Sequence, residues 1–241
     1  MPNPKDNLIL PKHESWEMFN AISPKYDLVN RLLTFGQDLS WRKRLGEHLP
    51  PQKGQIILDI ATGTADVLIT LLENYPAIRM GYGIDLAQKM LEIGRAKIEK
   101  RWLSKKIMLQ TGDAQSLQFM NETFDCVTIA FGIRNLPDLH KALSEIYRVL
   151  KKGGRLLVLE TALPQNAILR SGHLFFIRNI VPLIGLIVAR NYRAYRYLNQ
   201  TIESFPYAEN FCTILKERGF QNTKCHPLLG GVTMIYQGDK L

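Results

Sequence analysis

Hydrophobic residues follow two patterns along most of the chain. Short apolar runs, typical of buried strands, are separated by segments in which apolar residues recur at helical spacing. The runs predict strands at residues 55–60, 79–84, 107–110, 124–130, 154–160, 223–228 and 232–236. The spacing predicts helices at residues 65–74, 86–101, 138–150 and 207–218. This rhythm indicates an α/β fold with a mostly parallel, seven-stranded sheet and helices on both faces.

Two segments depart from this rhythm. Residues 14–49 have an amphipathic helical pattern, and after Thr161 the strand–helix alternation stops until the helix predicted at 207–218. We therefore expect a helical N-terminal extension (1–49) that acts as a lid. A domain of residues 50–241 follows, with a helical insertion at about 165–202.

The most apolar stretch of the chain lies inside the insertion, at residues 174–189. It is 16 residues long and includes Arg178, Asn179 and Pro182. A membrane-spanning helix needs about 20 predominantly apolar residues. The length predicts a buried or interfacial helix and not a transmembrane one.

The charge balance points to an anionic partner. Lys and Arg number 31 against 22 Asp and Glu, a net charge of +9, which favours a nucleic acid, a membrane surface or a polyanionic ligand. A hydrophobic share of 46% excludes a disordered chain. The three cysteines have no CxxC spacing, and the N-terminus has no signal-like apolar run, so we expect reduced thiols and a cytoplasmic location.

Three acids follow successive predicted strands: Asp59, Asp85 and Asp113. Because the carboxyl ends of parallel strands meet at one edge of a sheet, these acids would line one ligand-binding crevice. Gly63 permits a tight turn after the first strand, but the GxGxxG pattern of dinucleotide sites is missing. The carboxylates suit a cationic ligand with a ribose and an adenine, such as S-adenosylmethionine. The alternative is that they are only helix caps or strand-end acids.

Longer motifs make the pattern more specific. They read YDLVN at 26–30, LTFG at 33–36, LDIATGT at 58–64, GDA at 112–114, FDCVTIAFGIRN at 124–135 and RVLKKGGR at 148–155. With these motifs the chain resembles the ubiquinone/menaquinone biosynthesis C-methyltransferases, from about residue 19 to 240. The resemblance implies a Rossmann-like class I methyltransferase fold with S-adenosylmethionine as methyl donor. It also implies a prenylated quinol as acceptor, either demethylmenaquinol or the benzoquinol precursor of ubiquinol.

The resemblance implies roles for residues after the second and third strands. Asp85 would hold the ribose of the cofactor. Asp113 would accept a hydrogen bond from the adenine amino group, with the Ala114 backbone beside it.

The turn after the first strand would hold the methionine part of the cofactor. By resemblance, Gly63 and Thr64 would approach this part, and Asp59 would orient the amino group. The family turn usually reads Gly-Thr-Gly-Asp, whereas this chain has Ala65 at the second glycine. If this position needs a positive φ, alanine costs roughly 1 kcal/mol; if it needs only a small side chain, alanine is harmless.

The catalytic residues implied are Arg134 and Asn135 after the fourth strand and Tyr26 in the extension. A ring carbon becomes nucleophilic when the neighbouring phenol loses its proton. Arg134 would stabilise the phenolate through charge-assisted hydrogen bonds, Asn135 would fix a quinol oxygen, and Tyr26 would close over the ring. Arginine is not a base at ordinary pH, so the proton would leave through water. The alternatives are a surface arginine, a turn-forming asparagine and a core tyrosine.

No metal is predicted, because the five histidines have no ligand spacing. The segment 161–202 contains arginines but no Asp, Glu or Lys: Arg170, Arg178, Arg190, Arg193 and Arg196. With apolar residues between them, this suits peripheral contact with an anionic membrane that supplies the prenyl tail. A homodimer interface or a core helix with solvated arginines would explain the same pattern.

Two other functions compete with quinol methylation. The charge of +9 also suits an RNA methyltransferase. However, the Asn/Asp-Pro-Pro-aromatic motif of exocyclic-amine methylation is replaced by AFGIRN at 130–135. Cytosine C5 methylation needs a nucleophilic cysteine, whereas Cys126 precedes the apolar part of its strand, which is typical of a structural residue. We therefore expect no nucleic-acid partner. A protein that binds S-adenosylmethionine without catalysis is the third hypothesis.

Overall fold

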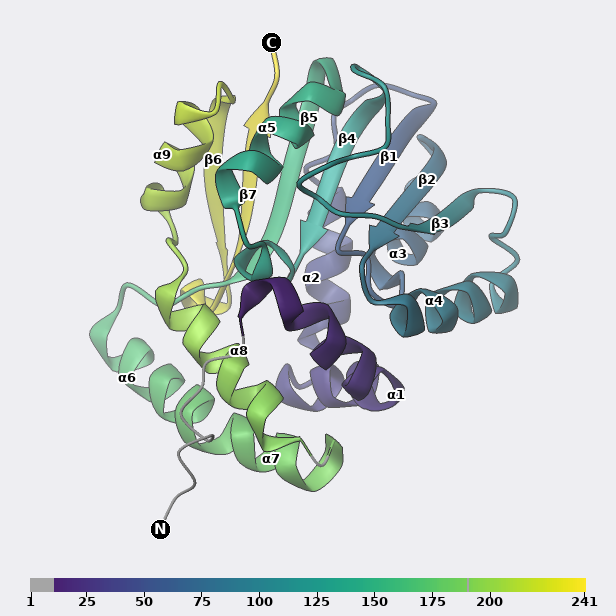
Figure 1. Cartoon of the computed structure of the whole chain (residues 1–241). Coiled ribbons are helices and arrows are strands. Elements are labelled where there is room, and N and C mark those ends of the chain that lie inside the picture. The colour runs from purple at the N-terminus through teal and green to yellow at the C-terminus, as the bar shows by residue number, and fades with distance from the viewer. Residues whose placement is uncertain (1–10, 190) are drawn as a thin grey trace.

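The computed structural model describes residues 11–189 and 191–241. Its strands form one seven-stranded sheet in the order β3-β2-β1-β4-β5-β7-β6 (Figure 1). β7 runs antiparallel to its neighbours β5 and β6, and the other strand pairs are parallel. The predicted sheet is thus confirmed. The strands are β1 (Gln55–Ile60), β2 (Ile78–Asp85), β3 (Ile107–Thr111), β4 (Phe124–Ala130), β5 (Leu150–Thr161), β6 (Gln221–Leu228) and β7 (Thr233–Asp239).

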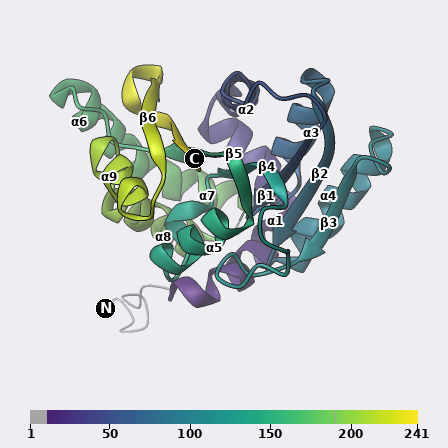
Figure 2. The same ribbon diagram turned by 90° about the horizontal axis from the view of Figure 1, so that it is seen from above.

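Helices cover both faces of the sheet (Figure 2). Because side chains alternate along a strand, β1 contributes to two separate cores. Ile57 packs in the cluster that contains Leu45 and Leu68, under α2, α3 and α4. Leu58 packs in the cluster that contains Ile146 and Phe211, under α5 and α9. The helices are α2 (Gln37–Gly46), α3 (Asp66–Asn74), α4 (Gln88–Lys100), α5 (Leu139–Val149) and α9 (Glu209–Glu217).

A helical cap lies at the carboxyl ends of the parallel strands (Figure 1). It has its own apolar cluster, which joins Ile22 to Ile177, Val181 and Tyr195. The Tyr195 ring packs directly against Gly185. A Cβ at position 185 would lie 2.1 Å from this ring, so only glycine permits the contact. The predicted extension and insertion therefore pack together. The cap helices are α1 (Ser15–Leu33), α6 (Ala167–Phe175), α7 (Val181–Ala189) and α8 (Tyr192–Ser204).

α6 and α7 are joined by a π-helical turn, Phe176–Ile180, into one helix. Pro182 explains the turn, because proline has no N–H to donate to the Arg178 carbonyl and its ring would clash with that group. By length and composition, the joined helix Ala167–Val188, of 22 residues, could cross a membrane, and 22% of an 18-residue window within it is buried. The helix is therefore longer than the apolar stretch of 16 residues from which the sequence argument against a membrane-spanning length was made. The packing of α7 on α1 and α8 nevertheless covers one side of the helix with protein.

Candidate active site

A pocket lies at the carboxyl ends of β1, β2 and β4, where the chain order reverses along the sheet. Four predicted cofactor residues line it: Gly63, Asp85, Asp113 and Ala114. The Asp85 carboxylate accepts backbone hydrogen bonds from Gly63 N at 2.9 Å and Ala87 N at 2.8 Å. A carboxylate has about four acceptor sites, so Asp85 keeps acceptor capacity for a ligand hydroxyl. Gly63 has φ 55°, and its missing side chain leaves open space beside the backbone.

α1 forms the roof of this pocket, with Trp16, Phe19 and Tyr26 in its lining. The helix is held down at α4, because Asn20 Oδ1 accepts a hydrogen bond from Lys89 N at 2.9 Å. The extension thus contributes side chains to the pocket and does not only border it.

A second cavity, of about 240 Å³, lies between α1 and the insertion. It shares Phe19, Tyr26, Phe131 and Asn135 with the first pocket, so the two spaces adjoin. Its lining is mostly aromatic and aliphatic, and it also includes polar side chains such as Arg134, Asn135 and His173. This composition suits an apolar ligand that has a polar end. The aromatic lining also includes Phe35, Trp41, Phe176, Tyr195 and Tyr197.

Arg134 is a buried charge in the wall of this cavity and not a surface arginine, at 5% exposure. It lies on the 3-10 turn Ile133–Asn135 that follows β4. Its Nη1 donates to Phe131 O at 2.7 Å and to the carboxylate of Glu160, which is fully buried near the end of β5. Burial raises the pKa of Glu160, and Arg134 opposes this shift. Sequence reasoning missed Glu160, although an acid at the end of a predicted strand was the available signal.

Several residues that line the cavity have a buried polar atom without a hydrogen-bond partner among the described residues. These atoms include Arg134 Nε, Asn135 Oδ1 and His173 Nε2. Burial lowers the pKa of His173 and raises that of Tyr26. Unpaired buried polar atoms that line a cavity are the groups a polar ligand would satisfy. His173 was missed because it lies in the middle of an inserted helix with no motif around it.

Asp59 and Thr64 are not among the residues that line the cofactor pocket, and the roles predicted for them stay predictions. Asp59 is 1% exposed and accepts hydrogen bonds from Thr62 at 2.7 Å and Thr128 at 2.6 Å. It shares a face of β1 with Ile57 and so points under α2 and α3. The Thr64 hydroxyl instead donates to Asp27 at 2.7 Å. The hydrogen bonds of Asp59 and Thr64 therefore hold the turn after β1 on the side away from the pocket.

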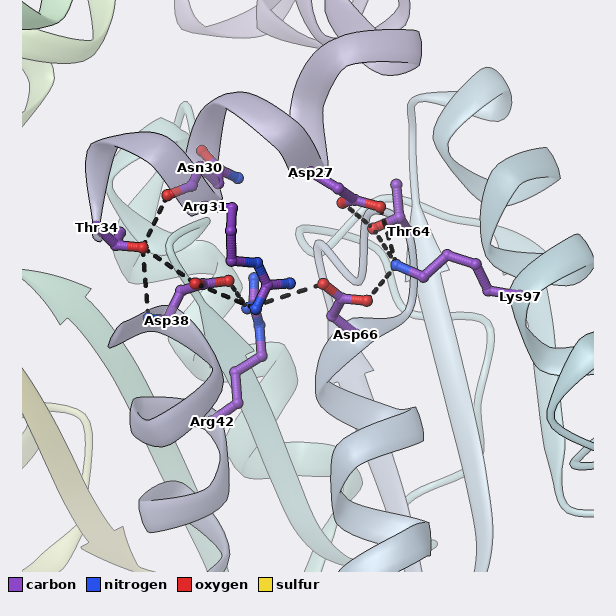
Figure 3. A network of polar contacts seen from close by, with 9 residues as sticks. All are labelled: Asp27, Asn30, Arg31, Thr34, Asp38, Arg42, Thr64, Asp66 and Lys97. Atoms are coloured by element: carbon purple, nitrogen blue, oxygen red, sulfur yellow. Dashed lines mark hydrogen bonds and ion pairs between the residues drawn. The ribbon is translucent and has the colours of Figure 1, made fainter. Parts of the chain in front are cut away.

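A polar network connects this turn to four helices, α1 to α4 (Figure 3). Lys97 of α4 lies 3.0 Å from Asp27 of α1 and also bonds Asp66, the first residue of α3. Arg42 of α2 lies 3.8 Å from Asp66 and pairs with Asp38. The network fixes α1 and α2 relative to the cofactor turn.

Ala65 has φ 65° and ψ 17°, in the left-handed region. The position therefore needs a positive φ, which costs alanine roughly 1 kcal/mol relative to glycine. Ala65 is fully buried, and a Cβ on Gly94 of α4 would lie 3.3 Å from its methyl group. The small pair Ala65 and Gly94 allows α4 to approach the turn closely.

The family model of the ubiE/COQ5 methyltransferase family matches residues 10–240. The chain belongs to this family. It is 37% identical to a ubiquinone/menaquinone biosynthesis C-methyltransferase UbiE of Geotalea uraniireducens, over 93% of this chain and 95% of that protein. It is 41% identical to a demethylmenaquinone methyltransferase of Thermus thermophilus, over 92% of this chain and 100% of that protein.

The fold is shared with solved structures of lower identity. A SAM-dependent methyltransferase from Thermotoga maritima, a possible histamine N-methyltransferase, superposes with a TM-score of 0.67 at 19% identity, over 94% of this chain and 100% of that one. The protein is thus an S-adenosylmethionine-dependent methyltransferase with the predicted Rossmann-like fold. Its pocket fits this methyl donor, because the Asp85 carboxylate has free lone pairs there and the Gly63 backbone borders open space.

In this methyltransferase, burial raises the pKa of Asp59 to about 7, against hydrogen bonds from Thr128 and Thr62 that lower it. Between the unfolded value of 3.8 and about 7, the folded state holds a proton that the unfolded state has released. Stability from this group therefore falls as pH rises through that window. We expect Asp59→Asn to be near neutral at pH 4 and to raise the free energy of unfolding at pH 8, by up to roughly 4 kcal/mol. Urea denaturation at both pH values tests this; equal changes at the two would contradict it.

Proposed function

We propose that this methyltransferase transfers a methyl group from S-adenosylmethionine to a ring carbon of a prenylated quinol. The acceptor is demethylmenaquinol or the benzoquinol precursor of ubiquinol. The observation that carries the proposal is the apolar cavity that adjoins the cofactor pocket at Tyr26, Phe131 and Asn135. The names of the relatives support the same substrate class.

In the proposed site, Asp85 holds the ribose and Asp113, with the Ala114 backbone, lies at the adenine. The Gly63 backbone lies beside the methionine part. The bound donor supplies an electrophilic methyl group on a sulfonium. Asp59 and Thr64 act indirectly, because their side chains fix the turn that carries Gly63.

The quinol ring occupies the cavity beside Arg134, whose fixed positive charge favours the phenolate over the neutral phenol. Glu160 is a positioning residue, because it holds the guanidinium from the far side of the cavity wall. Asn135 Oδ1 is available to a quinol hydroxyl, and Tyr26 covers the ring from α1. Arg134 cannot accept the phenolic proton, which leaves through water. After methyl transfer the ring carbon loses its C–H proton and the phenol is restored, so one proton is released for each methyl group transferred.

The test is transfer of labelled methyl from S-adenosylmethionine into a demethylated naphthoquinol and a demethylated benzoquinol, each with a short prenyl chain. Labelled quinol from either acceptor supports the proposal. Label found only in added RNA would favour the RNA methyltransferase hypothesis. Cofactor binding without any transfer would favour a non-catalytic role.

The proposal includes peripheral contact with the cytoplasmic face of an anionic membrane through α6 and α7. Leu183 and Leu186 of α7 and Phe175 of α6 are exposed apolar side chains on this helix. Two exposed arginines accompany them: Arg170 lies on α6 itself and Arg193 at the start of α8. Membrane surfaces bind helices with exposed apolar and basic residues. A homodimer through the same surface is the alternative.

The other arginines of the segment divide differently. Arg178 pairs with Glu203 at 2.6 Å. Glu203 is the first residue after the segment 161–202, which contains no acidic residue. Arg196 is half-buried, and Arg190 lies outside the described residues.

The same proposal includes the domain division. It divides the chain into an extension of residues 1–49, in which α1 acts as a lid, and a methyltransferase domain of residues 50–241, with the insertion at about 165–202.

We expect Leu183→Glu/Leu186→Glu to weaken sedimentation with anionic vesicles at least tenfold. Each buried CH₂ contributes about 0.8 kcal/mol to membrane binding, and an anionic surface repels the new charges. Met120→Glu is the matched control, because Met120 is equally a highly exposed apolar residue but lies in the loop before β4. Unchanged vesicle binding, with loss of a dimer in analytical ultracentrifugation, would favour the homodimer.

A further inference from the structure

An open groove lies on the surface between the carboxyl end of α1 and α7. It is separate from the cofactor pocket and has mostly aliphatic walls. We propose that it holds the prenyl tail of the substrate where the tail leaves the cavity, an inference that rests on the proposed function. Its lining residues are Arg31, Leu32, Phe35, Gly36, Ile184, Ile187 and Val188.

The groove and the cavity have one residue in common. Phe35 lines both spaces, and its ring lies 6.2 Å, centroid to centroid, from Phe176 in the cavity wall. In the proposed complex, the chain attached to the quinol ring passes Phe35 to reach the groove.

The size of the cavity favours such an exit. At about 240 Å³ it is smaller than the roughly 300–1,000 Å³ typical of pockets that enclose a whole drug-sized ligand. A ring with several prenyl units is larger than the ring alone, so we expect the later units to lie outside the cavity. An aliphatic groove is a surface that keeps such units from water.

Phe35 lies in the turn between α1 and α2, where both its solvent exposure and its backbone conformation are unfavourable for a phenylalanine. Its side chain is 82% exposed, and its backbone has φ 51°, which bulky residues rarely adopt. The turn is nevertheless held, because the Thr34 hydroxyl donates to Asn30 O at 2.8 Å and bonds Asp38 at 3.0 Å. A strained, exposed aromatic residue that is fixed in place is typical of a ligand contact.

The groove walls are accessible to a tail in the folded protein. Ile187 is 69% exposed and Leu32 is 45% exposed, so polar substitutions at these positions leave the cores intact. Leu229, in the turn before β7, is the matched control. It is 62% exposed and lines the cavity but not the groove.

The experiment compares Leu32→Gln/Ile187→Gln with Leu229→Gln and the unchanged protein. The substrates are demethylated naphthoquinols with one or with four prenyl units, assayed in detergent micelles so that membrane contact does not contribute. For the groove variant we expect kcat/KM to fall at least tenfold with the four-unit substrate and less than twofold with the one-unit substrate. We expect Leu229→Gln to change the ratio of the two values less than twofold.

A second measurement uses the tail alone. A free prenyl alcohol of four units should inhibit the unchanged protein competitively against the four-unit substrate, and its inhibition constant should rise at least tenfold in the groove variant. Calorimetric binding of S-adenosylmethionine shows that each variant is folded.

The inference is overturned if the groove variant keeps the ratio of the unchanged protein, or if Leu229→Gln lowers it equally. Failure of the unchanged protein to methylate even the one-unit substrate would refute the proposed function itself.

Discussion

Arg134→Ala is expected to lower kcat for quinol methylation at least a hundredfold, with little change in the affinity for S-adenosylmethionine. Loss of one donor to a developing oxyanion costs about 2.7–4 kcal/mol in the transition state. Arg134 lines the cavity and not the cofactor pocket, so the donor's binding residues are untouched. Single-turnover rates with a short-tailed quinol measure the effect.

The same substitution leaves Glu160 buried without its cation, which costs roughly 3–5 kcal/mol of stability. The double variant Arg134→Ala/Glu160→Gln removes the unpaired charge and separates folding from chemistry. We expect it to recover most of the lost stability but none of the lost kcat. Glu160→Gln alone keeps the guanidinium and should lose less activity than Arg134→Ala. Recovery of kcat in the double variant would show that Arg134 has only a structural role.

The pH profile gives an independent measure of the chemical role. Hydroxide can supply the phenolate that Arg134 no longer favours, so the double variant should recover activity in part at high pH. Arg134→Lys keeps the charge but loses the planar fork, and should have an intermediate rate. An increase in KM alone would mean uniform binding and would contradict a role in the transition state.

Asp85→Ala is expected to weaken S-adenosylmethionine binding more than tenfold. A hydrogen bond to a charged group contributes about 1.5–3 kcal/mol, and the ribose would lose two. Asp125→Ala is the matched control, because Asp125 also accepts a backbone hydrogen bond, from Ile56 N at 2.8 Å, but does not line the pocket. Its effect on affinity should be much smaller.

Isothermal titration calorimetry measures both affinities. Asp85 also accepts from Gly63 N and Ala87 N, so the thermal midpoint of Asp85→Ala must be measured in parallel. A folded Asp85→Ala protein with unchanged affinity would contradict the ribose assignment.

The sheet and the position of its crevice could be predicted from the sequence because both depend on local patterns. Apolar runs with helical segments between them specify parallel strands, and parallel strands bring their carboxyl ends to one edge. Asp85 and Asp113 therefore line the pocket as predicted, and Gly63 has the positive φ that its turn requires. Whether each binds the cofactor stays a prediction.

Alternation along β1 also decided the place of Asp59, but its direction could not be read from the strand alone. The side chain points under α2 and α3, where it accepts hydrogen bonds from the hydroxyls of Thr62 and Thr128. Thr128 is on β4, which lies beside β1 only in the folded sheet. The orientation of Thr64 depends in the same way on Asp27, 37 residues away in the chain.

The sequence by itself determined the elements, their order, the edge at which ligands bind and the family that the motifs resemble, because these follow from local periodicity and short motifs. Only the tertiary structure decided that Arg134 is paired with Glu160, that Ala65 is left-handed, and that Phe35 lines both the cavity and a groove. Each of these depends on segments that are far apart in the chain and meet only when the cap packs on the sheet. Contacts of that kind have no local periodicity from which they could be predicted.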